Sequence, residues 1–233
     1  MAALARFLLA LAMLPAACGL VRAAIRVMMF LASADDSIIS SRTAAFLSGF
    51  ALFAFVWVVL PKPVSAYVLG HELSHAVWAL AFGGKVSNLK FGPNGGHVNV
   101  SKSNMFITLA PYFFPIYTII VVIAALITEL CMGRLPWQPL WIGLVGFTWA
   151  FHVFFTIKSL LIRQPDIQEY GRLFSYNIIA IFNIAGVLAW IGFTTDFPFW
   201  RIGTVSCECI SEAYKFVADA AATFWHLATS TTI

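Results

Sequence analysis

Residues 64–82, VSAYVLGHELSHAVWALAF, decide how this chain of 233 residues is interpreted. The segment has about the length of a membrane-spanning helix, and its only histidines and acidic residue are His71, Glu72 and His75. Ionisable side chains at bilayer depth are energetically expensive, so a segment that retains three of them indicates a functional site. The fold and the chemistry of the chain therefore both centre on this segment.

The composition places the chain in a membrane. Hydrophobic residues make up 61% of the sequence and charged residues 10%, against about 45–50% and about 25% in soluble domains. The mean hydropathy is +0.88. These values exclude a soluble globular enzyme, a disordered tail and a disulfide-rich secreted scaffold. The formal net charge of +4 is not gathered in one block, so nucleic acid is not expected as a partner.

Several apolar windows predict an all-α polytopic membrane protein embedded in the lipid bilayer. Besides 64–82, the windows long enough to span are 43–60, 105–128, 135–157 and 173–195. A shorter N-terminal window, 7–21, fits a signal peptide, an interfacial helix or a further span. We therefore expect five to six transmembrane helices.

The placement of lysine and arginine predicts the orientation. If the five main spans alternate, ten of the 14 basic residues fall on one side of the membrane. Because basic residues are enriched in cytoplasmic loops, the connections after 64–82 and after 135–157 are expected in the cytoplasm. The site in 64–82 is then expected nearer the cytoplasmic face, and the C-terminus outside.

Two segments outside the spans have patterns of their own. Residues 85–100 alternate between polar and apolar side chains around a Gly-Pro-Asn-Gly-Gly turn, which predicts a β-hairpin between the second and third main spans. Charged residues after 195 recur at helical spacing, which predicts an amphipathic helix on the membrane surface, on a partner subunit or in solvent. We divide the chain into an N-terminal hydrophobic or interfacial segment (1–42), a transmembrane core (43–199) and a C-terminal amphipathic helix and tail (200–233).

The motif H-E-x-x-H at 71–75 predicts a metal site. Residues four apart lie on one face of a helix, so His71 and His75 can bind one ion. Glu72 can hold and deprotonate a water bound to that ion. The alternative interpretation is a pair of buried histidines that form hydrogen bonds to a neighbouring helix.

A catalytic zinc ion takes three protein ligands and leaves one position for water, so a third ligand must come from elsewhere. The candidates are His97, His152, Asp166 and Glu169. Asp166 follows Pro165 in a connection expected on the same side as His75, and it is also interpretable as a carboxylate at a helix start. For His152 we expect a core histidine bonded between helices.

The segment from Gly70 to Ala76, GHELSHA, followed by Gly83, Gly84 and a glycine-rich hairpin, resembles the site-2 protease family of intramembrane zinc metalloproteases. The chain is most similar to short members with little beyond the membrane core. The later APYFFP at 110–115 resembles the small-residue and proline segment that follows the hairpin in that family.

The resemblance implies the roles of the site residues. The metal ligands would be His71, His75 and Asp166, and the catalytic residue would be Glu72. The family's Asn-x-x-Pro and Leu-Asp-Gly elements are reduced here to Gln-Pro-Asp at 164–166, which places Gln164 near the substrate carbonyl. An extended substrate would pair with the hairpin near the stretch Val98, Asn99, Val100.

The resemblance also implies the activity. It predicts a zinc metalloendopeptidase, a hydrolase that cuts a membrane protein or peptide substrate by intramembrane proteolysis, with a zinc-bound water activated by Glu72. The alternative is a protease-like membrane subunit or binding protein of a larger complex, with structural zinc or none, that contacts a partner subunit through its C-terminal helix. A metal transporter is disfavoured because the motif in 64–82 has no internal repeat.

Overall fold

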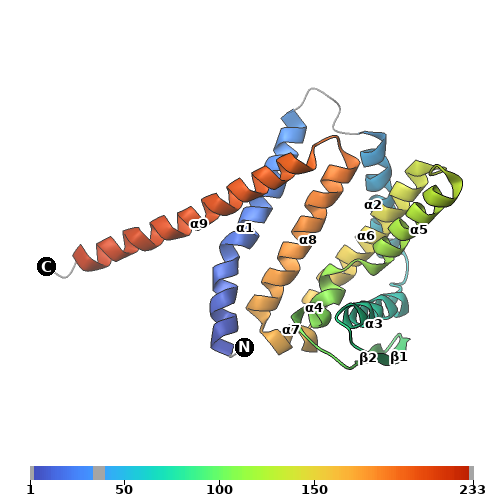
Figure 1. The fold of residues 1–233 in the computed structure, drawn as a ribbon, viewed down its shortest axis with the longest axis horizontal. Helices are drawn as coiled ribbons and strands as arrows, with labels where there is room; N and C mark the ends of the chain where they lie inside the picture. The colour runs from blue at the N-terminus through green and yellow to red at the C-terminus, as the bar shows by residue number, and fades with distance from the viewer. Residues whose placement is uncertain (1–2, 34–39, 231–233) are drawn as a thin grey trace. The chain divides into compact units, whose positions relative to one another are not determined.

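The computed structural model describes residues 3–33 and 40–230, most of which are helical (Figure 1). Contacts within the chain divide it into two compact units. The first contains α1 (Ala3–Ser33), α8 (Arg172–Thr194) and α9 (Phe199–Ser230). The second contains α2 to α7 and a two-stranded antiparallel sheet.

Several helices are long and apolar enough to cross a bilayer, as the composition predicted. In the described part of the chain these are α1, α2 (Ser41–Val59), α6 (Gln138–Leu160) and α8, and a bent pair of helices adds a fifth when it counts as one span. The expected count of five to six included residues 64–82. Their helix, α3 (Val64–Ala81), is not in this set, because its histidines and glutamate lower its mean hydropathy.

The bent pair consists of α4 (Met105–Phe113) and α5 (Ile116–Met132), where the sequence predicted one span over 105–128. The two helices meet at 76° around Phe114 and Pro115. Proline lacks the backbone N–H that would continue the helix, and its ring clashes with the preceding turn. Asn104 fixes the start of α4, because its side chain accepts hydrogen bonds from the backbone N–H groups of Phe106 and Ile107.

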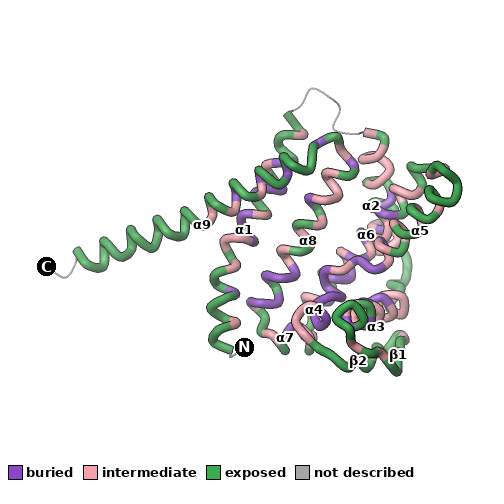
Figure 2. The backbone as a smooth tube through the Cα atoms, viewed as in Figure 1, coloured by how far each residue is buried: buried purple, intermediate pink, exposed green. Residues whose placement is uncertain are grey.

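In the first unit, α1 is one continuous helix of 31 residues, much longer than the window 7–21. It packs against α8 and α9 through small residues, and a Cβ at Gly19 would lie 2.6 Å from Cα of Ile210. Helix α9 is the predicted amphipathic helix, and its C-terminal half is exposed (Figure 2). The expected division placed α8 in the core with 43–199, whereas its contacts group it with α1 and α9.

In the second unit, the pairing of α2 and α6 positions one wall of the site. A Cβ at Gly49 would overlap the backbone of Gly143, so these helices can approach closely only with glycine there. An aromatic core around Phe53 and Phe155 fills the space beside this contact. The ring of Phe155 in turn stacks on Tyr67 of α3, with centroids 4.6 Å apart. The aromatic core between α2 and α6 therefore also contacts α3.

The hairpin forms where the sequence predicted it. Strand β1 (Val86–Gly92) pairs with β2 (Gly95–Val100), and Gly95 has a φ of 121°, which favours glycine at the turn. The sheet packs on α3. A Cβ at Gly96 would lie 2.6 Å from Cγ1 of Val68 and 3.0 Å from Cγ of Glu72. The absence of a side chain at Gly96 therefore lets β2 lie directly against the motif helix.

Candidate metal centre

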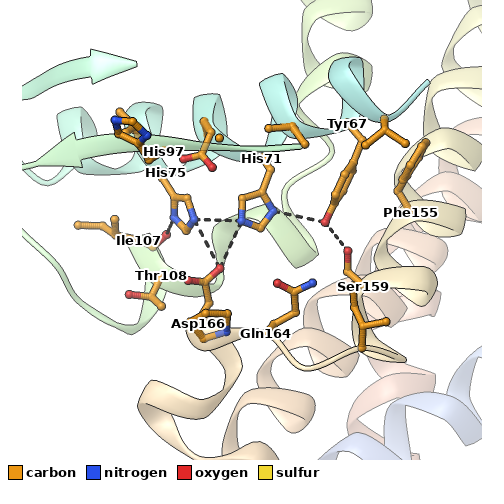
Figure 3. A pocket seen from close by; sticks show the side chains of 18 of the residues that line it. Tyr67, His71, His75, His97, Ile107, Thr108, Phe155, Ser159, Gln164 and Asp166 are labelled. Carbon is orange, nitrogen blue, oxygen red and sulfur yellow. Dashed lines mark hydrogen bonds and ion pairs between the residues drawn. The ribbon is translucent and has the colours of Figure 1, made fainter. Parts of the chain in front are cut away.

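Three side chains of the second unit converge on one point (Figure 3). The Nε2 atoms of His71 and His75 are 3.3 Å apart, because residues four apart share one face of α3. Oδ2 of Asp166 lies 3.3 Å from Nε2 of His71 and 3.6 Å from Nε2 of His75. The structure thus brings together the three residues that the resemblance implied as ligands.

Asp166 is supplied by α7 (Pro165–Tyr170), a six-residue helix. Asp166 lies in the first turn of this helix, as the alternative interpretation of a carboxylate at a helix start predicted, and Gly171, with a φ of 89°, separates α7 from α8. This break makes α7 an element of its own. The hydroxyl of Tyr112, a fully buried residue of α4, donates to Oδ2 of Asp166 over 3.0 Å and holds the carboxylate toward the histidines.

Each histidine has a partner on its other ring nitrogen. Nδ1 of His75 donates to the backbone carbonyl of Ile107, 2.8 Å away, so a neutral His75 directs the lone pair of Nε2 at the shared point. Nδ1 of His71 lies 3.4 Å from the hydroxyl of Tyr67. That hydroxyl also forms a hydrogen bond with the hydroxyl of Ser159 on α6. Such outer partners fix ring orientation and tautomer in metal sites.

The geometry fits a tetrahedral metal ion. Zinc binds imidazole and carboxylate at about 2.0–2.2 Å, so two ligand atoms of one tetrahedron lie about 3.3–3.5 Å apart. The three observed separations are 3.3, 3.3 and 3.6 Å. The Nε2 lone pair of a neutral His75 and a carboxylate oxygen repel each other unless a cation or a proton lies between them. His71, His75 and Asp166 are therefore a suitable ligand set for a divalent cation.

The carboxylate of Asp166 is held in its charged form. Burial by itself would raise the pKa of Asp166. In the ion-free site, where protons on Nε2 take the place of the cation, hydrogen bonds from His71 and His75 and the charges of the two rings outweigh burial. The net effect holds the pKa of this carboxyl well below its usual range. An ionised carboxylate is the form that binds a metal ion.

A cavity of about 620 Å³ opens onto the three side chains. Its walls come from α3, β2, the C-terminal end of α6 and α7. Glu72 lines the cavity and is only 8% exposed. The site therefore offers a buried carboxylate and room for a bound molecule beside the possible metal ligands.

The residues expected at the substrate divide into two groups. Gln164, Val98 and Val100 line the cavity. Asn99 is not among the lining residues, and its contact with a substrate stays a prediction. Side chains alternate along a strand, and Gly96 faces α3, so Val98 and Val100 share the face of Gly96.

The other candidates for a third ligand do not belong to the group that converges with His71 and His75. His97 and Glu169 line the cavity, and His152 is buried in α6 beside Trp149. Within residues 3–33 and 40–230, one group of three or more His, Cys, Asp or Glu side chains has its ligand atoms within 4.8 Å of one another. This group consists of His71, His75 and Asp166.

Sequence reasoning missed the outer partners, which are Tyr67, Tyr112, Ser159 and the carbonyl of Ile107. Tyr67 had a detectable signal, because it stands four residues before His71 and so shares the face of the two histidines. The others come from different helices, and no local pattern indicates them.

Comparison with known proteins adds no family assignment: no protein-family model, no curated protein and no solved structure matches the chain.

Proposed function

We propose that the chain is an intramembrane zinc metalloprotease of the site-2 type, which hydrolyses a peptide bond of a membrane-associated substrate. The observation that carries the proposal is the convergence of His71, His75 and Asp166 beside a buried Glu72 at one cavity. The apolar helices of the chain support a location within or near the bilayer.

The residues of the site have separate roles in this proposal. His71, His75 and Asp166 would hold the ion, with zinc favoured by two imidazoles and one carboxylate. When bound, zinc supplies Lewis-acid chemistry that polarises a carbonyl and makes a water molecule more acidic. Three protein ligands leave a position open for substrate or water, which distinguishes catalytic from structural zinc sites.

Glu72 is the general base. Its carboxylate accepts a proton from the attacking water as the water oxygen bonds to the scissile carbonyl carbon. The C–N bond then breaks, and Glu72 returns the proton to the leaving amine nitrogen. Burial suits Glu72 to this exchange, because a carboxylate with few competing waters interacts more strongly with the proton it transfers.

The hairpin provides a place for the substrate chain. A helical substrate hides its amides, so it must unwind locally before it can be cut. Strand β2 runs along the cavity and directs Val98 and Val100 toward α3, so an extended peptide can pair with the backbone of this strand. Gln164, on the α7 side of the cavity, is available to the carbonyl of such a peptide.

We also propose that the hairpin and α7 face the cytoplasm, on the basis of the excess of basic residues in these connections. Membrane-impermeant labelling of a cysteine introduced at Ser87 in sealed, oriented vesicles tests this placement. Labelling from the external side would overturn it.

The test of the proposed activity is Glu72→Gln in the full chain, purified and reconstituted with a set of single-span membrane peptides. The variant should keep its metal and cleave at least 100-fold more slowly, because a general base contributes about 10²–10⁴-fold to rate. Full turnover by the variant would remove Glu72 from the mechanism. Bound zinc in the wild type without cleavage of any peptide would favour the protease-like subunit instead.

A further inference from the structure

The partner of His71 distinguishes it from the other two candidate ligands. A backbone carbonyl, which only accepts, fixes the proton of His75 on Nδ1. Nδ1 of His71 instead faces the hydroxyl of Tyr67, which can donate as well as accept. Two tautomers of His71 are therefore compatible with this contact, and only the one with its proton on Nδ1 leaves Nε2 free to bind a metal ion.

Ser159 can resolve this choice. The hydroxyl of Tyr67 has one proton, and it contacts both Ser159 and Nδ1 of His71. If Tyr67 donates to Ser159, it must accept from Nδ1–H of His71. The contact of Tyr67 with Ser159 is shielded from competing water, because Ser159 is only 3% exposed.

We propose that Tyr67 and Ser159 act as a pair of positioning residues that set the tautomer of His71 and thereby the affinity of the site for a divalent cation. The proposal rests on the metal site proposed above and adds residues that do not touch the ion. Tyr67 is itself held in place, since its ring stacks on Phe155 at an interplanar angle of 6°. The hydroxyl pair therefore links the metal site on α3 to α6.

The arrangement predicts that the two hydroxyls are not independent. In Ser159→Ala, Tyr67 keeps its proton without its acceptor on α6 and can donate it to Nδ1 of His71. The proton of His71 then moves to Nε2, where it competes with the metal. In Tyr67→Phe no hydroxyl remains to donate to His71, so the additional loss of the Ser159 hydroxyl should lower the metal affinity little further.

The experiment is a double-mutant cycle on Zn²⁺ and Co²⁺ affinity in the detergent-purified full chain, measured by competition with a chelating dye and by the Co²⁺ absorption spectrum. We expect Tyr67→Phe and Ser159→Ala each to weaken binding about 10-fold, within the 10–100-fold range for outer partners of metal ligands. The metal affinity of the double variant should lie within about threefold of the affinity of the single variant that binds more weakly. Ser159→Thr, which keeps a hydroxyl at this position, should retain most of the wild-type metal affinity.

Tyr117→Phe is the matched control. Its hydroxyl also contacts α3, through the carbonyl of Ala66, and its ring packs on Phe151. Loss of a hydroxyl there should leave metal affinity unchanged. Wild-type affinity in Tyr67→Phe, or strictly additive losses in the double variant, would overturn the proposed pair while leaving the metal site intact. A wild type that binds neither ion would instead contradict the proposed function.

Discussion

Each compact unit contains a cluster of ionisable side chains. The distances between the polar atoms are similar in the two clusters, but only one cluster is arranged to bind a metal ion. Between α1 and α9, Arg22 and Arg26 pair with Glu208 and Glu212 at 2.8–3.6 Å. Between α3 and α7, His71, His75 and Asp166 lie 3.3–3.6 Å apart. In the first cluster each carboxylate faces a guanidinium, so the charges are balanced by the protein itself.

The second cluster is not balanced in that way. Its Nε2 and Oδ2 atoms face a common point, while hydrogen bonds from the opposite sides hold the rings and the carboxylate in place. It is also less exposed, with side-chain exposures of 13–24% against 34–56% for the arginine–glutamate cluster. A short distance between ionisable groups therefore indicates a ligand site only when the groups converge on one point and hydrogen bonds hold them there from the opposite side.

Metal removal should give the largest difference between the two clusters. A ligand that binds only the folded state stabilises it by about 4 kcal/mol at a concentration 1,000-fold above its Kd. A strong chelator should therefore lower the unfolding temperature of the wild type and have no effect on His71→Ala. A chelator effect of equal size in both proteins would show that the stabilising ion is bound elsewhere.

Two glycines at close contacts offer the next comparison. Gly96→Ala would push β2 away from Glu72, whereas Gly19→Ala would push α1 away from Ile210 of α9. Each should destabilise its own unit by about 1–3 kcal/mol, as overpacking generally does. Only Gly96→Ala should also slow cleavage, because only that glycine lies beside Glu72, the proposed general base.

Gly92→Ala is the local control for the hairpin, since a Cβ there meets only ordinary contact at 4.0 Å. The measurements are peptide cleavage, metal content and thermal unfolding of the three variants. Unchanged cleavage by Gly96→Ala would show that the position of β2 does not influence the site.

The smallest effect is expected in the arginine–glutamate cluster. Glu212 pairs with both Arg22 and Arg26 at exposed positions, and exposed ion pairs contribute about 0–1 kcal/mol. Glu212→Gln should therefore change the free energy of unfolding by less than about 1 kcal/mol, and the loss should shrink at high salt. A loss above 2 kcal/mol, or any loss of bound metal, would contradict the contrast drawn between the two clusters.

Much of the fold and the centre of the site could be predicted because their signals are local. The spacing of His71 and His75 follows from the helical repeat, and the hairpin follows from alternation around a glycine-rich turn. Asp166 could be predicted as one of four candidates, and its choice depended on the expected side of the membrane and on a resemblance, since nothing near it in the sequence shows which helix it faces.

What the sequence missed depends on tertiary contacts and on single backbone breaks. Pro115 breaks a window that hydropathy alone interprets as one span, and Gly171 separates α7 from α8. The contacts of Tyr112 with Asp166 and of Tyr67 with Ser159 join residues 54 and 92 positions apart. The close approach of β2 to α3 depends on Gly96, a residue without a side chain to indicate it.

We propose that α3 and α7 together hold one divalent cation, and metal analysis of the purified wild type beside Asp166→Ala and Glu72→Gln is the decisive measurement. We expect about one zinc per chain in the wild type and in Glu72→Gln, and loss of the metal in Asp166→Ala, because three protein ligands hold a catalytic zinc. Full zinc occupancy in Asp166→Ala would contradict it and would move the third ligand to another residue of the cavity.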